Sequence, residues 1–196
     1  MQTTEKIIKY LKDNLTEKRF WHTMGVAKTA QSLAEMWGAD SASAFLAGLV
    51  HDCAKEVSYN ETIEGLTENG YIPDEIEKQS TALLHAPYGA ILAREIFGIE
   101  NQEILNAIKY HTVGRPNMTL LEKIVYVADF IEPNRRFDEA EIVRQLAYKD
   151  LDKAVLSECD IIIGFNQDKE KVVHPATLIT RDYYFKLTKE GKNNET

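Results

Sequence analysis

Several features are scarce in this sequence, and each shortage excludes a class of protein. Only 2 cysteines are present, Cys53 and Cys159, far apart and in no CxxC pattern, so we expect two reduced, buried thiols and no disulfide. No apolar run approaches the length of a membrane span, and the residues after Met1 lack the apolar core of a signal peptide. We therefore expect a cytoplasmic protein with no membrane partner.

Basic residues are also scarce relative to acidic ones. The 23 Lys and Arg stand against 31 Asp and Glu, which gives a formal net charge of −8. This charge argues against a nucleic-acid partner, which would require a basic binding face. An anionic small molecule remains compatible with it if the positive groups are local, as in a metal site or a few placed Arg and Lys.

Internal repeats, low-complexity linkers and convincing alternating strand patterns are missing as well. Residues 161–165 are the best strand candidate, but this stretch is short and fits a helix more easily. A length of 196 residues and a hydrophobic content of 44% suit one domain with a sizeable core. The sequence therefore predicts a single all-α domain over residues 1–188, followed by a frayed polar tail over residues 189–196.

Apolar residues at helical spacing, together with capping residues, predict where the helices lie. We expect helices after Thr3 or Thr4, over 16–37, 41–50, 101–111, 119–133, 139–147 and 150–163, and from Pro175 onward, with a short polar helix or loop over 57–71. Pro87 suits the first position of a helix over 88–97. His85 would then lie just before a helix N-terminus, where anions are favoured.

The most unusual stretch is the predicted helix over 41–50, in which every residue is apolar or small, and which leads directly into His51 and Asp52. Such a helix is expected to be buried on nearly all sides, with its small residues allowing a close neighbour. A buried carboxylate beside an imidazole must be paired, hydrogen-bonded or coordinated to a metal, because an isolated buried charge is too costly. A simple His–Asp hydrogen bond at a helix end is the plainer interpretation of this pair alone.

Four further residues change that interpretation. His22 and His111 lie on apolar helix faces, His85 lies at an apolar segment, and Asp129 lies on or beside an apolar face. Six ligand-type side chains on five segments would each need a separate buried partner, whereas one shared metal site satisfies them together. Imidazoles and carboxylates suit Fe, Mn, Co or Zn, and the number of ligands suits two ions bridged by Asp52. Such a pair generates a hydroxide nucleophile for phosphate esters and anhydrides.

These residues carry a family resemblance. His22, His51-Asp52 and Asp129, with His85 and His111 between them, follow the order of the two-metal HD-domain phosphohydrolases. The local sequences AGLVHDCAK, LHAPYGA, YHTVGR and VADFIEPNR resemble the YqeK-type family of symmetrical diadenosine tetraphosphate hydrolases, over residues 19–181. The resemblance implies a helical HD-type bundle, a di-iron site and hydrolysis of diadenosine tetraphosphate to two ADP.

The resemblance also implies roles for individual residues. One ion would be held by His22, His51, Asp52 and Asp129, and the other by Asp52, His85 and His111. Asp52 and Lys55 would be catalytic, and Arg19, Lys55 and Arg135 would meet phosphate. Substrate is further expected to contact the ligands His22, His85, His111 and Asp129, and also Glu56, Thr112, Val172, Val173, His174, Pro175, Ala176 and Thr177.

Other interpretations remain open at this point. The chain could be another HD-type enzyme, namely a nucleotidase, a nucleoside-triphosphate hydrolase or a cyclic-dinucleotide phosphodiesterase, or a nucleotide-sensing module without turnover. Lys55, Arg136 and His174 could simply be solvated, Arg115 could be a surface residue, and Tyr88 is not assigned. The metal, the base specificity and the choice between monomer and homodimer are left undecided by the sequence.

Overall fold

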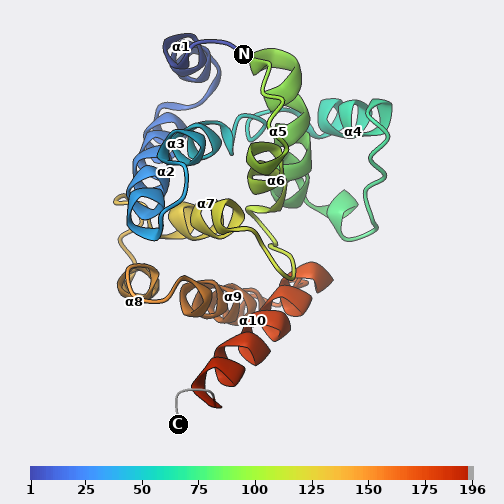
Figure 1. Ribbon diagram of the computed structural model, residues 1–196. Helices are drawn as coiled ribbons and strands as arrows, with labels where there is room; N and C mark the ends of the chain where they lie inside the picture. Colours follow the sequence, from blue (N-terminus) through green and yellow to red (C-terminus); the bar gives the residue numbers. More distant parts are fainter. Residues whose placement is uncertain (194–196) are drawn as a thin grey trace.

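The computed structural model describes residues 1–193, with side chains described through Glu190, and all regular structure in this range is helical (Figure 1). The all-α prediction is therefore confirmed. No helix in this range is long and apolar enough to cross a membrane. The elements are α1 Thr4–Asn14, α2 Glu17–Trp37, α3 Ser41–Val50, α4 Tyr59–Glu68, the 3-10 helix η1 Glu77–Gln79, α5 Thr81–Phe97, α6 Gln102–Tyr110, α7 Leu120–Ile131, α8 Asp138–Ala147, α9 Leu151–Asp168 and α10 Pro175–Asn193.

Most helix boundaries follow from local capping chemistry. The Asp40 side chain accepts a hydrogen bond from the N–H of Ser43, and Thr119 forms a capping box with Glu122. α2 ends at Gly38, where φ is +74°, a left-handed conformation that favours glycine. These signals depend on nearby residues only, which explains why the sequence located them.

The helix expected to begin at Tyr88 begins at Thr81 instead. Pro87 therefore lies inside α5, and the prediction that His85 precedes a helix N-terminus is wrong. A proline inside a helix removes one backbone hydrogen bond, the one that its N–H would donate. The segment nevertheless stays helical because residues 84–89 are all buried in the molecule. Tertiary packing overrides the local break, and the helix-dipole argument for His85 no longer applies.

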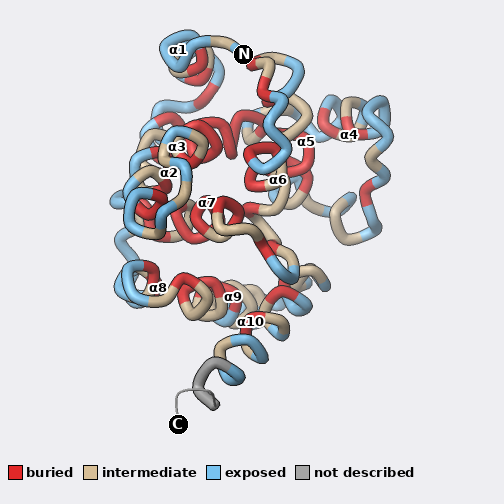
Figure 2. Tube along the Cα trace, in the orientation of Figure 1, coloured by how far each residue is buried: buried red, intermediate tan, exposed pale blue. Residues whose placement is uncertain are grey.

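α3 lies at the centre of the fold, against α2 and α7. Figure 2 shows that the most continuously buried segments belong to α3, α7 and their neighbours, whereas α1 and α8 are more exposed. Ala44 and residues 46–50 are buried, and Ala42 in the first turn is exposed. The close neighbour is α2, since a Cβ on Gly48 would lie 2.9 Å from Ala27 Cα.

The other expectations concern the end of the chain and the thiols. α9 continues to Asp168, so the strand candidate at residues 161–165 is helical. α10 continues past residue 188 to Asn193, and residues 194–196 of the predicted tail lie outside the described residues. Cys53 and Cys159 are both free and buried, as predicted. Tyr184 of α10 is also buried.

Candidate metal centre

The fold brings the six predicted ligands into one cluster. His22 lies on α2, His85 on α5 and Asp129 on α7, while His51-Asp52 and His111 directly follow α3 and α6. All of them except the partly buried Asp129 are buried. The imidazole rings form a row from His22 through His51 and His111 to His85, with centroids 5.4, 4.9 and 5.0 Å apart.

Asp52 divides this row into two groups. Its Oδ2 atom lies 3.8 Å from His22 Nε2 and 3.5 Å from His51 Nε2. Its Oδ1 atom lies 3.0 Å from His85 Nε2 and 3.7 Å from His111 Nε2. Each carboxylate oxygen therefore faces a different pair of histidines, as expected of a carboxylate that bridges two ions.

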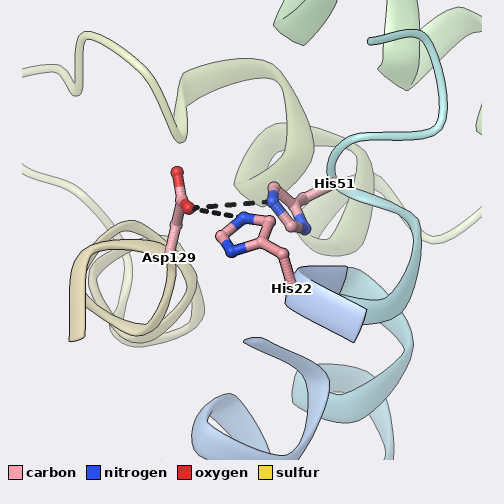
Figure 3. Close-up of side chains that lie close together, drawn as sticks. All are labelled: His22, His51 and Asp129. Carbon is pink, nitrogen blue, oxygen red and sulfur yellow. Dashed lines mark ion pairs between the residues drawn. The ribbon is translucent and has the colours of Figure 1, made fainter. Parts of the chain in front are cut away.

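Asp129 completes the first group. Its Oδ1 atom lies 3.0 Å from His22 Nε2 and 3.9 Å from His51 Nε2, and Figure 3 shows the three side chains converging from separate segments. Ligand atoms of His22, His51 and Asp129 all lie within 4.8 Å of one another, and so do those of His51, Asp52 and His111. The ligand atoms of each set are therefore close enough together to hold one cation.

Hydrogen bonds orient the imidazoles for coordination. Each of His51 and His111 donates from Nδ1 to a carbonyl of the preceding helix turn, at Gly48 and Ile108, both over 2.7 Å. Because a carbonyl only accepts, Nδ1 carries the proton, and in a neutral ring Nε2 presents its lone pair to the cluster. The Nε2 atom of His51 is buried without a hydrogen-bond partner in the described structure, and that of His22 faces the Asp129 carboxylate.

The spacing of these atoms fits metal coordination. For bonds of about 2.1 Å, two ligands of one ion are about 3.0 Å apart at right angles and about 3.4 Å apart at the tetrahedral angle. The separations within the two groups run from 3.0 to 3.9 Å. Converging imidazole nitrogens and carboxylate oxygens, with the unpartnered Nε2 atom of His51 among them, are a donor set suited to divalent cations.

Charges within the cluster prepare the ligands for a cation. Burial alone would raise the pKa of Asp52, but His51 and His85 outweigh burial and hold this pKa well below its usual range. Burial lowers the pKa of His111 to about 3, with His51 and His85 adding to the effect, so His111 is neutral at physiological pH. Burial also lowers the pKa of His22, but Asp129 and Glu132 outweigh it and raise the value to about 9. The negative charges of Asp129 and Glu132 beside His22 therefore favour a bound cation, either a proton or a metal ion.

Glu132, which is not among the predicted site residues, orients His22. Glu132 is buried, and its Oε1 atom accepts a hydrogen bond from His22 Nδ1 over 3.0 Å, while Oε2 accepts from the backbone N–H of Asn134 over 2.8 Å. A Cβ on Gly25, one turn after His22, would overlap the Glu132 carboxylate, so this glycine provides the space. This role depends on a contact between residues 110 positions apart, and no sequence pattern around Glu132 indicates it.

We expect Glu132→Gln to weaken metal binding. The amide keeps the size of the side chain but removes the negative charge that supports His22. Changes to hydrogen-bond partners of ligating histidines typically cost about 10–100-fold in metal affinity, and we expect a loss in this range. Metal titration followed by elemental analysis measures it. Glu75→Gln, which alters a carboxylate on the exposed surface, is the control and should leave affinity unchanged; equal affinity in both variants would contradict the assigned role.

The predicted phosphate-binding residues border the cluster. Arg19 Nη1 lies 2.6 Å from Asp52 Oδ2, and Arg135 Nη2 lies 3.0 Å from Asp129 Oδ1. Lys55 Nζ lies 3.1 Å from His85 Nε2 and 3.9 Å from Asp52 Oδ1. Burial lowers the pKa of this lysine, together with the nearby Arg19 charge, although Asp52 opposes them. Three cationic side chains therefore lie within reach of a phosphate placed at the cluster.

Two recesses hold predicted substrate-binding residues, and the first of them also has the ligand His22 in its lining. Recess A, of about 460 Å³, is lined by Thr16, Arg19, His22 and Arg135. The Thr16 hydroxyl donates a hydrogen bond over 3.0 Å to Glu56, one of the predicted substrate contacts. Recess B, of about 500 Å³, is lined by residues 82–83 of α5 next to His85 and, among the predicted substrate contacts, by Thr112, Val172, Val173, His174 and Thr177. Pro175 and Ala176 are not part of that lining.

Other candidates have different surroundings. Arg115 Nη2 forms a 2.8 Å ion pair with the buried Glu122, so it supports the start of α7 and is more than a surface residue. Tyr88 is buried in a small cluster with Leu66 and Leu84, which indicates packing. Arg136 is exposed and lines neither recess. His174 pairs with Asp74 Oδ2 over 3.1 Å at the edge of recess B.

Comparison with known proteins places these features in context. The HD domain family model matches residues 19–134. A "Bis(5′-nucleosyl)-tetraphosphatase, symmetrical" from Halalkalibacterium halodurans is 45% identical over 89% of this chain and 93% of its own length, and its namesake from Bacillus subtilis is 41% identical over 91% and 96%. The crystal structure of a predicted HD superfamily hydrolase involved in NAD metabolism, from Clostridium acetobutylicum, is similar with a TM-score of 0.92, 44% identity and coverage of 95% and 98% of the two chains.

Proposed function

This chain belongs to the HD-domain family and, within it, to the family of symmetrical bis(5′-nucleosyl)-tetraphosphatases, and from that premise we propose that it hydrolyses diadenosine tetraphosphate to two ADP with two divalent ions. The observation that carries the proposal is the position of Asp52. One of its oxygens faces His22 and His51, and the other faces His85 and His111. A cluster that offers two sets of ligands around a shared carboxylate supports two-ion phosphoanhydride hydrolysis.

The protein's own residues position the substrate and stabilise charge. Bound divalent ions would supply Lewis acidity and an acidified water as the nucleophile. Arg19, Lys55 and Arg135 converge at the cluster boundary, where the phosphoryl oxygens gain negative charge in the transition state. Cleavage between the second and third phosphates releases ADP, a good leaving group, so no separate general acid is required.

We further propose iron as the metal and the cytoplasm as the compartment. Imidazole and carboxylate ligands accept Fe(II), and they also accept Mn(II), Co(II) and Zn(II). The two free, buried cysteines fit a reducing compartment. Metal analysis of protein purified from its native host without added metal tests the first point, and cell fractionation tests the second.

A chromatographic product assay tests the activity. Purified protein is incubated with diadenosine tetraphosphate and Fe(II), Mn(II) or Co(II), with chelator-treated protein as the control. ADP as the sole product, absent from the control, is the expected result. AMP plus ATP would contradict the cleavage position. No product from folded, metal-loaded protein would refute the proposal in favour of another nucleotidase chemistry or a binding module.

A further inference from the structure

Recess A contains two large apolar side chains that the phosphate chemistry does not use. Trp21 and Phe137 both line it, although each is strongly exposed, with 58% and 41% of its surface accessible to solvent. Large aromatic groups left this open beside charged residues call for an explanation, because burying them elsewhere would stabilise the fold.

Both rings are held in place rather than free. Trp21 lies on α2, next to His22 in sequence, and its ring packs edge-on against Phe20 with centroids 5.4 Å apart. Phe137 precedes α8, and its ring packs edge-on against Phe130 at 5.3 Å. Each aromatic side chain therefore has a defined position while part of its surface remains open to the recess.

The recess has two chemically different parts. Arg19 and Arg135 contact the carboxylates of Asp52 and Asp129 at the cluster, so they form the part that suits phosphate. The aromatic pair forms a part suited to a planar, uncharged group. Phosphate beside a planar group is the chemistry of a nucleotide, whose base stacks on aromatic side chains.

We propose that recess A binds one nucleoside of the dinucleotide, with Trp21 and Phe137 stacking on its base. This inference rests on the proposed function. Recess B, whose lining includes Thr112 next to His111 in the sequence, would take the other nucleoside. The two recesses have nearly equal volumes, about 460 and 500 Å³, both within the range of small-molecule sites.

Binding of one nucleoside in each recess would agree with the proposed symmetric cleavage. Recess A includes His22, which faces Asp52 Oδ2, and recess B includes Thr112, next to His111, which faces Asp52 Oδ1. Figure 1 shows α2, which contributes to recess A, on one side of the molecule and the first turn of α10, which contributes to recess B, on the other. A substrate with a nucleoside in each recess would place the middle of its phosphate chain at the cluster.

Kinetics of the metal-loaded Trp21→Ala variant test the inference. KM for diadenosine tetraphosphate should rise about 10–100-fold, the effect of losing a base–aromatic stack, while kcat stays within about threefold because the cluster is intact. Trp21→Phe should restore most of the affinity. Phe165→Ala removes an exposed ring on α9 that lines neither recess, and it should leave KM unchanged.

Fluorescence gives a readout that is independent of turnover. Trp21 and the half-buried Trp37 are the 2 tryptophans of the chain, so ADP added to wild-type protein should quench Trp21, and Trp21→Ala, which retains Trp37, should show no quenching. An unchanged KM in Trp21→Ala, or quenching that persists in it, would overturn the inference while leaving the hydrolase assignment intact. Quenching by ADP in a protein that does not hydrolyse the dinucleotide would support the recess and refute the activity.

Discussion

Asp52→Ala should lose metal and activity together. Asp52 offers one oxygen to each group of histidines, so its removal deprives both prospective metal sites of a ligand. Metal ions contribute several kcal/mol of charge stabilisation to the transition state, so we expect kcat/KM to fall by at least about 10³-fold. Elemental analysis of the purified variant should show both ions reduced, and the product assay should show little ADP.

The control for this variant is Asp160→Ala, which removes an exposed carboxylate on α9 that pairs with Arg181. It should retain full metal content and turnover. Circular dichroism should confirm that Asp52→Ala keeps its helices, because the loss concerns a polar cluster and leaves the apolar core unchanged. A folded Asp52→Ala protein with wild-type metal content and turnover would refute the bridging role.

Gly48→Ala should destabilise the protein despite improving local helix propensity. An alanine Cβ would lie 2.9 Å from Ala27 Cα, 3.1 Å from Ala27 N and 3.1 Å from Val26 O, and these backbone atoms of α2 cannot turn away as a side chain could. Overpacking typically costs about 1–3 kcal/mol, and the gain from replacing glycine within a helix offsets up to about 1 kcal/mol. We therefore expect the free energy of unfolding to fall by about 1–2 kcal/mol and Tm to fall by about 2–8 °C.

Gly164→Ala is the matched control, since Gly164 lies inside α9 and a Cβ there meets no atom within 4 Å. The free energy of unfolding should rise by about 0.5–1 kcal/mol, because alanine loses less backbone entropy in a helix. Thermal unfolding of both variants measures the contrast. If Gly48→Ala were as stable as Gly164→Ala, the close approach of α2 and α3 would not be rigid. Gly48→Ala should also weaken metal binding, because the Gly48 carbonyl orients His51.

The features that the sequence predicted correctly are those with a local cause. The caps at Asp40 and Thr119 use groups within three residues, and apolar periodicity follows from the pitch of a single helix. The ligand-type residues stood out because a histidine or aspartate among apolar neighbours needs a partner. Six such residues on five segments were therefore enough to predict that His22, His51, Asp52, His85, His111 and Asp129 share a site.

The sequence did not predict features that depend on contacts with other segments of the chain. Pro87 is an adequate start for a helix, yet α5 continues through it because the surrounding segment is buried. The role of Arg115 was left open by the sequence, and the fold places this residue against Glu122. In both cases packing against other segments outweighs the preference of the residue itself.

By itself, then, the sequence determined the helical class, most helix boundaries and the chemical identity of the cluster, because each depends on residue types and their spacing along one helix. Only the tertiary structure decided which Asp52 oxygen faces which histidines, that Glu132 supports His22 across 110 positions, and that Trp21 and Phe137 share a recess. These relations exist between side chains on different helices. They depend on how the helices pack, and helix packing sets distances and directions that no spacing within one segment encodes.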